Sequence, residues 1–242
     1  MTLQLLKWGA KIKANFKGEL SPFNLAAKYC DENIVQMFID NGANPNDNYA
    51  LLSAICTGNL DVVELLLKSG ADPNIILKLE DLTPEAFENP EDIDFHNLKS
   101  LDEMPIIINK IKSPFEDDEF VTDLSALHLA CCDIGASFWE FLPPQAKIVK
   151  LLIDYGANVN AMCKSVNYSY EYTPLDFVKK SEKLNGSTFR LTFEEDYHYD
   201  DKSNLIVDLD CKDEGEMLGK IIFLLDNKQA NYHTSSRVLK ER

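Results

Sequence analysis

Apolar residues recur along the chain at the spacing of amphipathic helices. In residues 60–69 they form a wide apolar face on a helix of about 3.6 residues per turn. A short pattern closes this segment and returns elsewhere: two apolar residues, two further residues, then Gly-Ala. Its copies begin at Leu5, Phe38, Leu66, Leu152 and, in a worn form, Leu224. The pattern predicts a series of helices, and Gly42, Gly70 and Gly156 are expected to end three of them in the left-handed conformation.

A second pattern lies between these copies and predicts the partner helices. It begins at Ser21, Ser125 and Thr173, continues with Pro or Ala, and places Ala near its end in the first two copies. A Ser or Thr hydroxyl accepts a hydrogen bond from the first turn of a helix. Pro22 and Pro174 fall at the first helical position, where a missing N–H costs little. The chain is therefore expected to alternate inner helices with outer helices.

Together the two patterns resemble the ankyrin repeat. Gly9 and Gly42 are 33 residues apart, which is the ankyrin period, and the segments that begin at Ser125 and Thr173 resemble the T-P-L-H-x-A motif of that family. The resemblance implies a mainly α fold: an ankyrin-repeat α-solenoid of about four repeats plus an N-terminal half repeat. Because no single repeat buries its own apolar face, stacking is expected to hold the solenoid together.

The predicted layout is a single domain over residues 1–242, with a half repeat at 1–15 and a tail at 233–242. The full repeats cover about residues 16–46, 47–74, 123–160 and 161–232. Long insertions occupy residues 75–122, 133–145 and 181–216. Within the last insertion, residues 189–194 and 205–210 alternate apolar and polar side chains around a polar segment, 195–203, and this alternation predicts a β-hairpin.

The charged residues are unevenly distributed. The chain has 24 Lys and Arg against 40 Asp and Glu, a net charge of −16. Residues 75–122 hold 13 acidic and 4 basic residues, and residues 181–216 hold 11 and 4, so these two insertions (−9 and −7) account for the whole excess. This balance argues against a nucleic acid or an anionic membrane as partner. Two interpretations stay open: loops kept soluble by their charge, or acidic lobes that attract a basic partner.

The resemblance also implies contact residues, because ankyrin repeats bind other proteins through finger loops and the concave face of the inner helices. Three residues at such positions are Tyr29, Asn48 and Asp133. Further residues at equivalent positions are Leu20, Lys28, Cys56, Thr57, Leu124, Cys132 and Lys180. These side chains are expected to form the surface that a partner protein meets.

Three tyrosines follow one another at every second position of the predicted last finger. They are Tyr168, Tyr170 and Tyr172. In an extended segment alternate side chains point the same way, so the three rings predict an adhesive strip on one side of the finger. The alternative is that one or two of them pack on the adjacent repeat.

Candidate chemistry is sparse. His128 lies near Cys131 and Cys132, but the resemblance gives this histidine a structural role in bracing the finger loops. No catalytic residue, cofactor or metal ligand is predicted. The alternative is a metal-dependent enzyme or regulator that uses the carboxylates and His198 within residues 194–201. The six cysteines show no C-x-x-C spacing and are expected to be free thiols.

The expected function is therefore a non-enzymatic interaction module that binds another protein, in its most concrete form a basic one. Small stand-alone members of the family include immunity proteins for toxins and effectors delivered into host cells, and these two roles stay open. A further alternative is an assembly part that stacks through Leu3, Leu5 and Leu6 of the half-capped N-terminal flank. The expected location is the cytoplasm, or another cell after delivery, because no secretory or membrane-spanning segment is evident.

Overall fold

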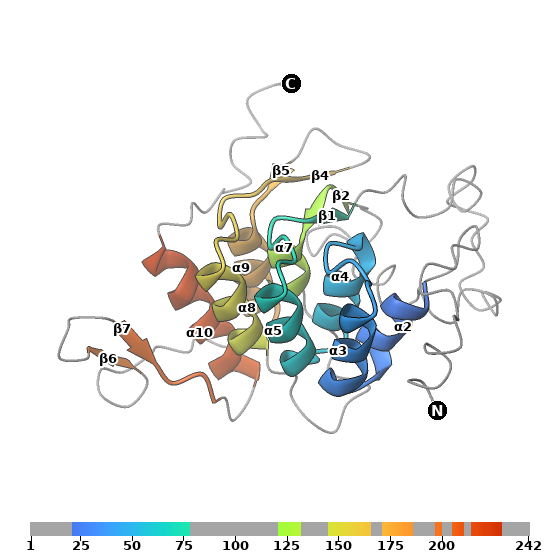
Figure 1. Cartoon of the computed structure of the whole chain (residues 1–242). Helices are drawn as coiled ribbons and strands as arrows, with labels where there is room; N and C mark the ends of the chain where they lie inside the picture. Colours follow the sequence, from blue (N-terminus) through green and yellow to red (C-terminus); the bar gives the residue numbers. More distant parts are fainter. Residues whose placement is uncertain are drawn as a thin grey trace.

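The computed structural model describes residues 21–77, 121–131, 145–165, 171–185, 197–199, 205–210 and 214–228. Its helices come in pairs. In chain order they are α2 (Pro22–Tyr29) and α3 (Glu32–Asp40), α4 (Asn48–Cys56) and α5 (Leu60–Lys68), α7 (Ala126–Cys131) and α8 (Gln145–Asp154), and α9 (Pro174–Asn185) and α10 (Glu214–Asn227). Figure 1 shows the pairs side by side, from α2 on the right to α10 on the left.

The helix pairs stack in two layers. Each inner helix contacts the next inner helix, in the order α2, α4, α7 and α9, and the outer helices follow in the order α3, α5, α8 and α10. Small residues line the inner layer: Ala27, Ala54 and Ala126 are fully buried. Their size lets neighbouring helices approach closely. The mainly α solenoid predicted from the sequence is confirmed.

The helix starts follow the predicted capping chemistry. The Ser21 hydroxyl accepts the Asn24 N–H at 3.2 Å, and the Thr173 hydroxyl accepts the Asp176 N–H at 3.3 Å. In the second repeat, where the motif is worn, Asp47 takes over as the cap of α4 and accepts the Tyr49 N–H at 3.5 Å. The same physical need is therefore met by different residues, because a helix start leaves N–H groups that require an acceptor.

The outer helices end alike and are tied together by asparagines. Gly42, Gly70 and Gly156 have φ values of 93°, 95° and 92°, as predicted for left-handed residues. Beyond the first of them, Asn46 donates to the Gly70 carbonyl at 3.0 Å and accepts the Asp72 N–H at 2.6 Å. Asn74 repeats this clamp on Gly156 and Asn158, at 3.1 and 2.8 Å. Each clamp joins the end of one outer helix to the end of the next.

Short strands connect the finger segments at one end of the helices (Figure 1). Strand β1 (Ile76–Leu77) pairs with β3 (Leu124–Ser125), in antiparallel register Ile76↔Ser125. Strands β2 (Val121–Thr122), β4 (Cys163–Ser165) and β5 (Glu171–Tyr172) form a three-stranded antiparallel sheet in the order β2-β4-β5. The two ends of the predicted insertion at 75–122 therefore meet at the base of one finger.

The last insertion departs from its predicted boundaries. Helix α9 continues to Asn185, past residue 181, where the insertion is predicted to begin, because nothing before Gly186 interrupts it. Helix α10 begins at Glu214, two residues before the predicted boundary at 216. Between them β6 (Tyr197–Tyr199) pairs with β7 (Leu205–Val207) in antiparallel register Tyr197↔Val207.

The strand pairing of the insertion corrects one prediction. Residues 197–199 were expected to lie in a polar turn, but they form β6, and their Tyr-His-Tyr sequence is rich in the aromatic residues that favour strands. The other predicted strand, at 189–194, lies outside the described residues. Figure 1 shows β6 and β7 beside the lower part of α10, away from strands β1 to β5.

Two further findings concern the described residues. None of their helices combines the length and the apolar character that spanning a membrane requires. The four described cysteines, Cys30, Cys56, Cys131 and Cys163, are free thiols, and all but Cys30 are buried.

Candidate partner-binding surface

His128 lies in the core and holds the last finger in place. Its Nδ1 accepts the Ser125 N–H at 3.2 Å, and its Nε2–H donates to the Tyr172 carbonyl at 2.9 Å. Burial lowers the pKa of His128 to about 4, although the Tyr172 carbonyl opposes this shift. The imidazole is therefore neutral at physiological pH and carries its proton on Nε2. These contacts fit the bracing role that the resemblance implies.

Tyr172 belongs to this brace and not to an exposed strip. Its side chain is only 8% exposed. Its ring meets Phe177 edge to face at a centroid distance of 6.3 Å. The prediction of Tyr172 as a partner contact is therefore wrong, because the ring packs on the inner helix α9 of its own repeat. Tyr168 and Tyr170, the other members of the predicted strip, lie outside the described residues.

The fourth repeat replaces the motif histidine with Asp176. Its carboxylate accepts the Thr173 N–H at 2.6 Å and the Thr173 hydroxyl at 2.7 Å. These hydrogen bonds stay within the first turn of α9, whereas those of His128 reach the next repeat. The Asp176 side chain is fully buried, so it adds to the cap of its own helix and not to the partner surface.

Tyr29 is the most exposed large apolar side chain of the described chain, at 61%. It is the last residue of α2, and the Lys28 ammonium lies 4.8 Å from the centre of its ring, within the range of a cation–π contact. Asn59 donates to the Cys30 carbonyl at 3.0 Å and so ties the following turn to the next repeat. The structure thus places this predicted contact residue at the surface, beside a turn fixed by two repeats.

The other predicted contact residues are buried, half-buried or outside the described residues. Lys28, Cys56 and Leu124 are buried, so they do not offer the surface that the family positions imply. Thr57 is half-buried, and its hydroxyl donates to the Ser53 carbonyl at 3.1 Å. Asn48 is the first residue of α4, and its side chain is outside the description, as are Leu20, Cys132, Asp133 and the Lys180 side chain.

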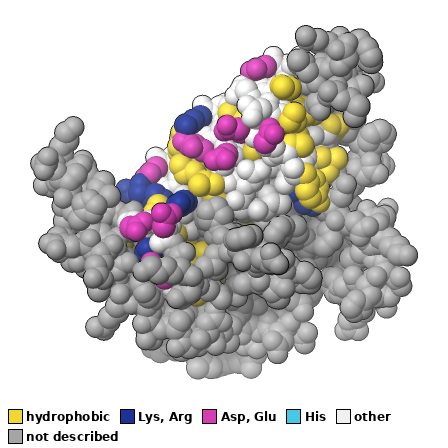
Figure 2. Space-filling view, turned by 90° about the horizontal axis from the view of Figure 1, so that it is seen from below, with side chains coloured by type: hydrophobic (Ala, Val, Ile, Leu, Met, Phe, Trp, Pro, Cys, Tyr) yellow, Lys and Arg dark blue, Asp and Glu magenta, His cyan; other side chains and the backbone are white. Residues whose placement is uncertain are grey.

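The surface of the described helices carries mixed charge. Figure 2 shows Asp and Glu side chains lying among Lys or Arg side chains and hydrophobic areas, seen from the side opposite to the fingers. Exposed i,i+4 pairs contribute to this pattern: Glu64 with Lys68 on α5 and Lys150 with Asp154 on α8. Helices α5 and α8 together hold three acidic and three basic residues, so these two helices do not contribute to the acidic excess.

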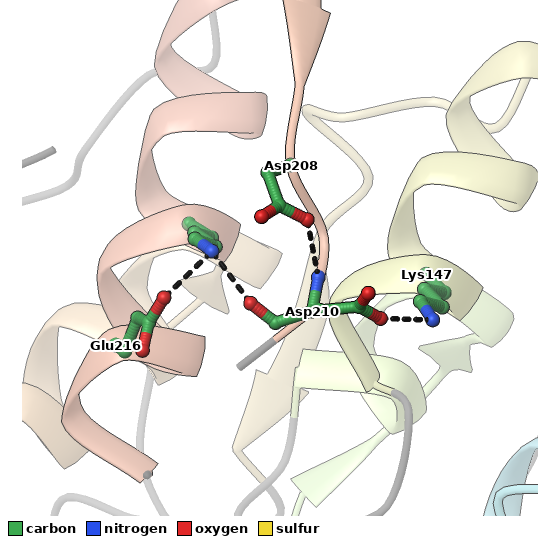
Figure 3. Close-up of polar contacts among 5 residues, drawn as sticks. Lys147, Asp208, Asp210 and Glu216 are labelled. Atoms are coloured by element: carbon green, nitrogen blue, oxygen red, sulfur yellow. Dashed lines mark hydrogen bonds and ion pairs between the residues drawn. The ribbon is translucent and has the colours of Figure 1, made fainter. Parts of the chain in front are cut away.

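A polar cluster that the sequence analysis missed lies between α8 and α10 (Figure 3). The Lys147 ammonium contacts the Asp210 carboxylate at 2.5 Å. The Lys220 ammonium donates to the Asp210 carbonyl at 2.7 Å and pairs with Glu216 at 2.7 Å. Lysine and glutamate at i,i+4 usually mark an exposed helix face, but here both side chains are buried. Alignment of α10 with the other outer helices would have revealed the lysine at an apolar position.

The residues of the metal alternative lie mostly outside the described ranges. Of residues 194–201 the structure describes only 197–199, without their side chains. Elsewhere in the described ranges, no group of three or more His, Cys, Asp or Glu side chains is placed to hold a metal ion.

Comparison with known families supports the sequence patterns independently. A model of ankyrin repeats in three copies matches residues 2–76, and a model of a single ankyrin repeat matches residues 122–164. These segments contain α2 to α5, α7 and α8, whereas α9 and α10 lie outside them and join the stack through contacts with α7 and α8. No curated protein matches the chain. Ankyrin repeats generally mediate protein–protein interaction and are typically non-enzymatic, and this chain belongs to the ankyrin-repeat family.

Proposed function

We propose that this chain binds another protein, with Tyr29 as a central contact of the described surface. The observation that carries the proposal is the exposure of Tyr29 at the end of α2. Tyr29 is 61% exposed, whereas two other residues at family contact positions, Lys28 next to it and Cys56 at the end of α4, are buried. Tyrosine contributes a large contact area and is enriched among residues that dominate binding energy. The Lys28 ammonium restrains the ring, which reduces the entropy lost on binding.

The partner is proposed to be basic. The net charge of −16 lies in the two long insertions, whereas the described outer helices carry both signs. An uneven charge of this kind steers a basic protein toward the insertions and raises its association rate at low salt. The proposed order of events is electrostatic capture followed by contact with Tyr29.

The finer role is also a proposal. An ankyrin-repeat protein that captures and neutralises a basic protein in the cytoplasm fits an immunity-type role. The same binding surface would serve an effector delivered into another cell. The two roles differ in the source of the partner, so they are separated by identifying which lysate contains it.

A pull-down with two matched tyrosine variants tests the proposal. Tyr29→Ala removes the proposed contact, and Tyr155→Ala removes another exposed ring, 39% exposed and adjacent to Gly156 at the end of α8. Wild-type protein and the Y155A control are expected to capture the same partner at low salt, and Y29A is expected to capture markedly less. Equal capture by all three proteins would contradict the role of Tyr29, and capture unaffected by high salt would contradict a basic partner.

A further inference from the structure

Lys220 occupies a position that other repeats fill with apolar residues. The Lys228 N–H donates to the Leu225 carbonyl at 3.0 Å, as Gly70 does to Leu67 at 3.1 Å and Gly156 to Ile153 at 3.0 Å. The donors of these hydrogen bonds therefore occupy equivalent positions at the helix ends. Eight residues before each donor lie Lys220, Val62 and Ile148, respectively. Val62 and Ile148 are fully buried and Lys220 is 1% exposed. An ammonium group at such a position requires partners, since burying an unpaired charge is costly.

The partners come from a second departure in the same helix. Helix α10 has 14 residues against nine in α5, and four of the five additional residues extend its N-terminus. Glu216 lies in this extension, at a position equivalent to Gly58 in the turn before α5. Its carboxylate pairs with Lys220, and only 8% of the Glu216 side chain is exposed. The buried charge and the group that neutralises it therefore occur together, in the one described outer helix that follows a long acidic insertion.

The remaining partner is the chain that returns from the insertion. Every polar group of Asp210 is engaged: its carbonyl by Lys220, its carboxylate by Lys147, and its N–H by the Asp208 carboxylate at 3.0 Å. Leu209 is half-buried and packs against the core. Figure 3 shows Asp210 between the two helices that hold Lys147 and Glu216. Segment 208–210 is thus attached to two helices through Asp210: its carboxylate contacts α8 and its carbonyl contacts α10.

We propose that Lys220 is a positioning residue that anchors segment 208–210 between α8 and α10 and so fixes where the β6–β7 insertion rejoins the solenoid. The inner contact, made by Lys220 and Glu216, is buried and is expected to be insensitive to salt. The outer contact, made by Lys147, is exposed and is expected to weaken as salt rises. These contacts hold the insertion whether or not a partner is bound.

Hydrogen exchange of the full-length protein tests this arrangement. Lys220→Met together with Glu216→Leu removes both buried charges, so that neither is left unpaired, and avoids the misfolding that Lys220→Met alone risks. Amides of residues 205–210 in this double variant are expected to exchange roughly tenfold faster or more, as the loss of a charged hydrogen bond implies. Amides of α5 and α10 are expected to keep their wild-type rates. Lys147→Met is expected to accelerate residues 205–210 less, and only at low salt.

Three results would overturn the proposal. Unchanged exchange of residues 205–210 in the double variant would mean that Lys220 does not hold the segment. Acceleration of the segment only in step with α10 would mean that the charges stabilise the helix and do not position the insertion. A larger effect of Lys147→Met than of the double variant would place the anchor on α8. Asp154→Asn, which breaks a similar exposed pair on α8 without touching the segment, is the control.

Discussion

Two junctions between consecutive repeats join neighbouring outer helices through different kinds of contact. Between the second and third repeats, Asn74 joins the ends of α5 and α8 with two neutral hydrogen bonds, at 3.1 and 2.8 Å. Between the third and fourth repeats, Asp210 joins α8 to α10 through two lysines. The first junction repeats the clamp of Asn46, although 86 residues separate Gly70 from Gly156. The second occurs where the inserted chain returns to the stack.

The difference shows what an insertion requires of its host repeat. An amide clamp can recur because neighbouring helix ends present the same carbonyl and N–H groups each time. A chain that returns from an insertion does not meet these recurring groups, so other side chains must hold it in place. Charges supply strong directional contacts, but a buried charge is tolerated only where all its partners are present. Lysine at position 220 is therefore specific to this repeat and not a general substitute for a core residue.

The largest effect is expected from placing a lysine at the equivalent position of a regular repeat. Val62→Lys would bury an ammonium group where α5 offers no Glu216 and no returning carbonyl. We expect a loss of about 4 kcal/mol in the free energy of unfolding, comparable with breaking a buried pair. Urea unfolding of V62K measures it, with Val62→Met as the control for the change in shape. A loss in V62K no greater than that in V62M would show that Lys220 needs no special partners.

The next largest effect is expected from protonation of His128, which should lower the free energy of unfolding at acidic pH. Because its pKa is lowered from 6.5 to about 4, the unfolded chain binds a proton more readily than the folded one between these values. Stability is therefore complete above pH 6.5 and falls toward pH 4, by roughly 3 kcal/mol in total for a shift of this size. Unfolding of wild-type protein and His128→Gln between pH 4 and 7 checks the sign. An equal slope in both proteins would assign the pH dependence to other groups.

Much of the fold could be predicted because its rules are local. A glycine ends each regular outer helix and a Ser or Thr starts most inner ones. The roles of Gly70 and Thr173 can therefore be predicted from the residues next to them in the sequence. Burial is different, since it depends on residues far away in the sequence. Tyr172 alternates with Tyr170 as a strand should, but only the packing of α9 decides that its ring faces Phe177.

The candidate site shows the same limit. Lys28 and Tyr29 are adjacent family contact positions, yet the structure buries one and exposes the other. The sequence pattern predicts the end of the helix but not which side chain its surroundings cover. Lys220 was missed for the opposite reason, since a lysine four residues after Glu216 has the pattern of a solvent-exposed pair. Only alignment with Val62 and Ile148 shows that it lies in the core.

The neutral junction is expected to give an intermediate effect. Asn74→Ala removes both hydrogen bonds of the clamp, and each neutral bond contributes about 1 kcal/mol, so a loss of roughly 1–2 kcal/mol is expected. Because no charge is involved, the loss should be the same at low and high salt. Urea unfolding at two salt concentrations measures it, and Asn46→Ala should behave alike at the preceding junction. A salt-dependent loss would show that the two junctions do not differ in the way their contacts suggest.

The smallest effect is expected from the outer contact of the charged junction. The Lys147 side chain is 39% exposed and that of Asp210 is 81% exposed, so solvent and salt screen their attraction. The hydrogen bond from Lys147 lowers the pKa of Asp210, and its stabilising contribution is therefore present at neutral pH and lost as pH falls through that lowered value. Lys147→Met is expected to lower the melting temperature slightly at low salt and not at about 1 M salt, where the screening length is roughly 3 Å. Lys150→Met, which breaks the exposed pair with Asp154 on the same helix, controls for the loss of an ordinary exposed ion pair. If the two variants respond alike to salt, the Lys147 contact contributes no more than such a pair, and the junction depends on Lys220 alone.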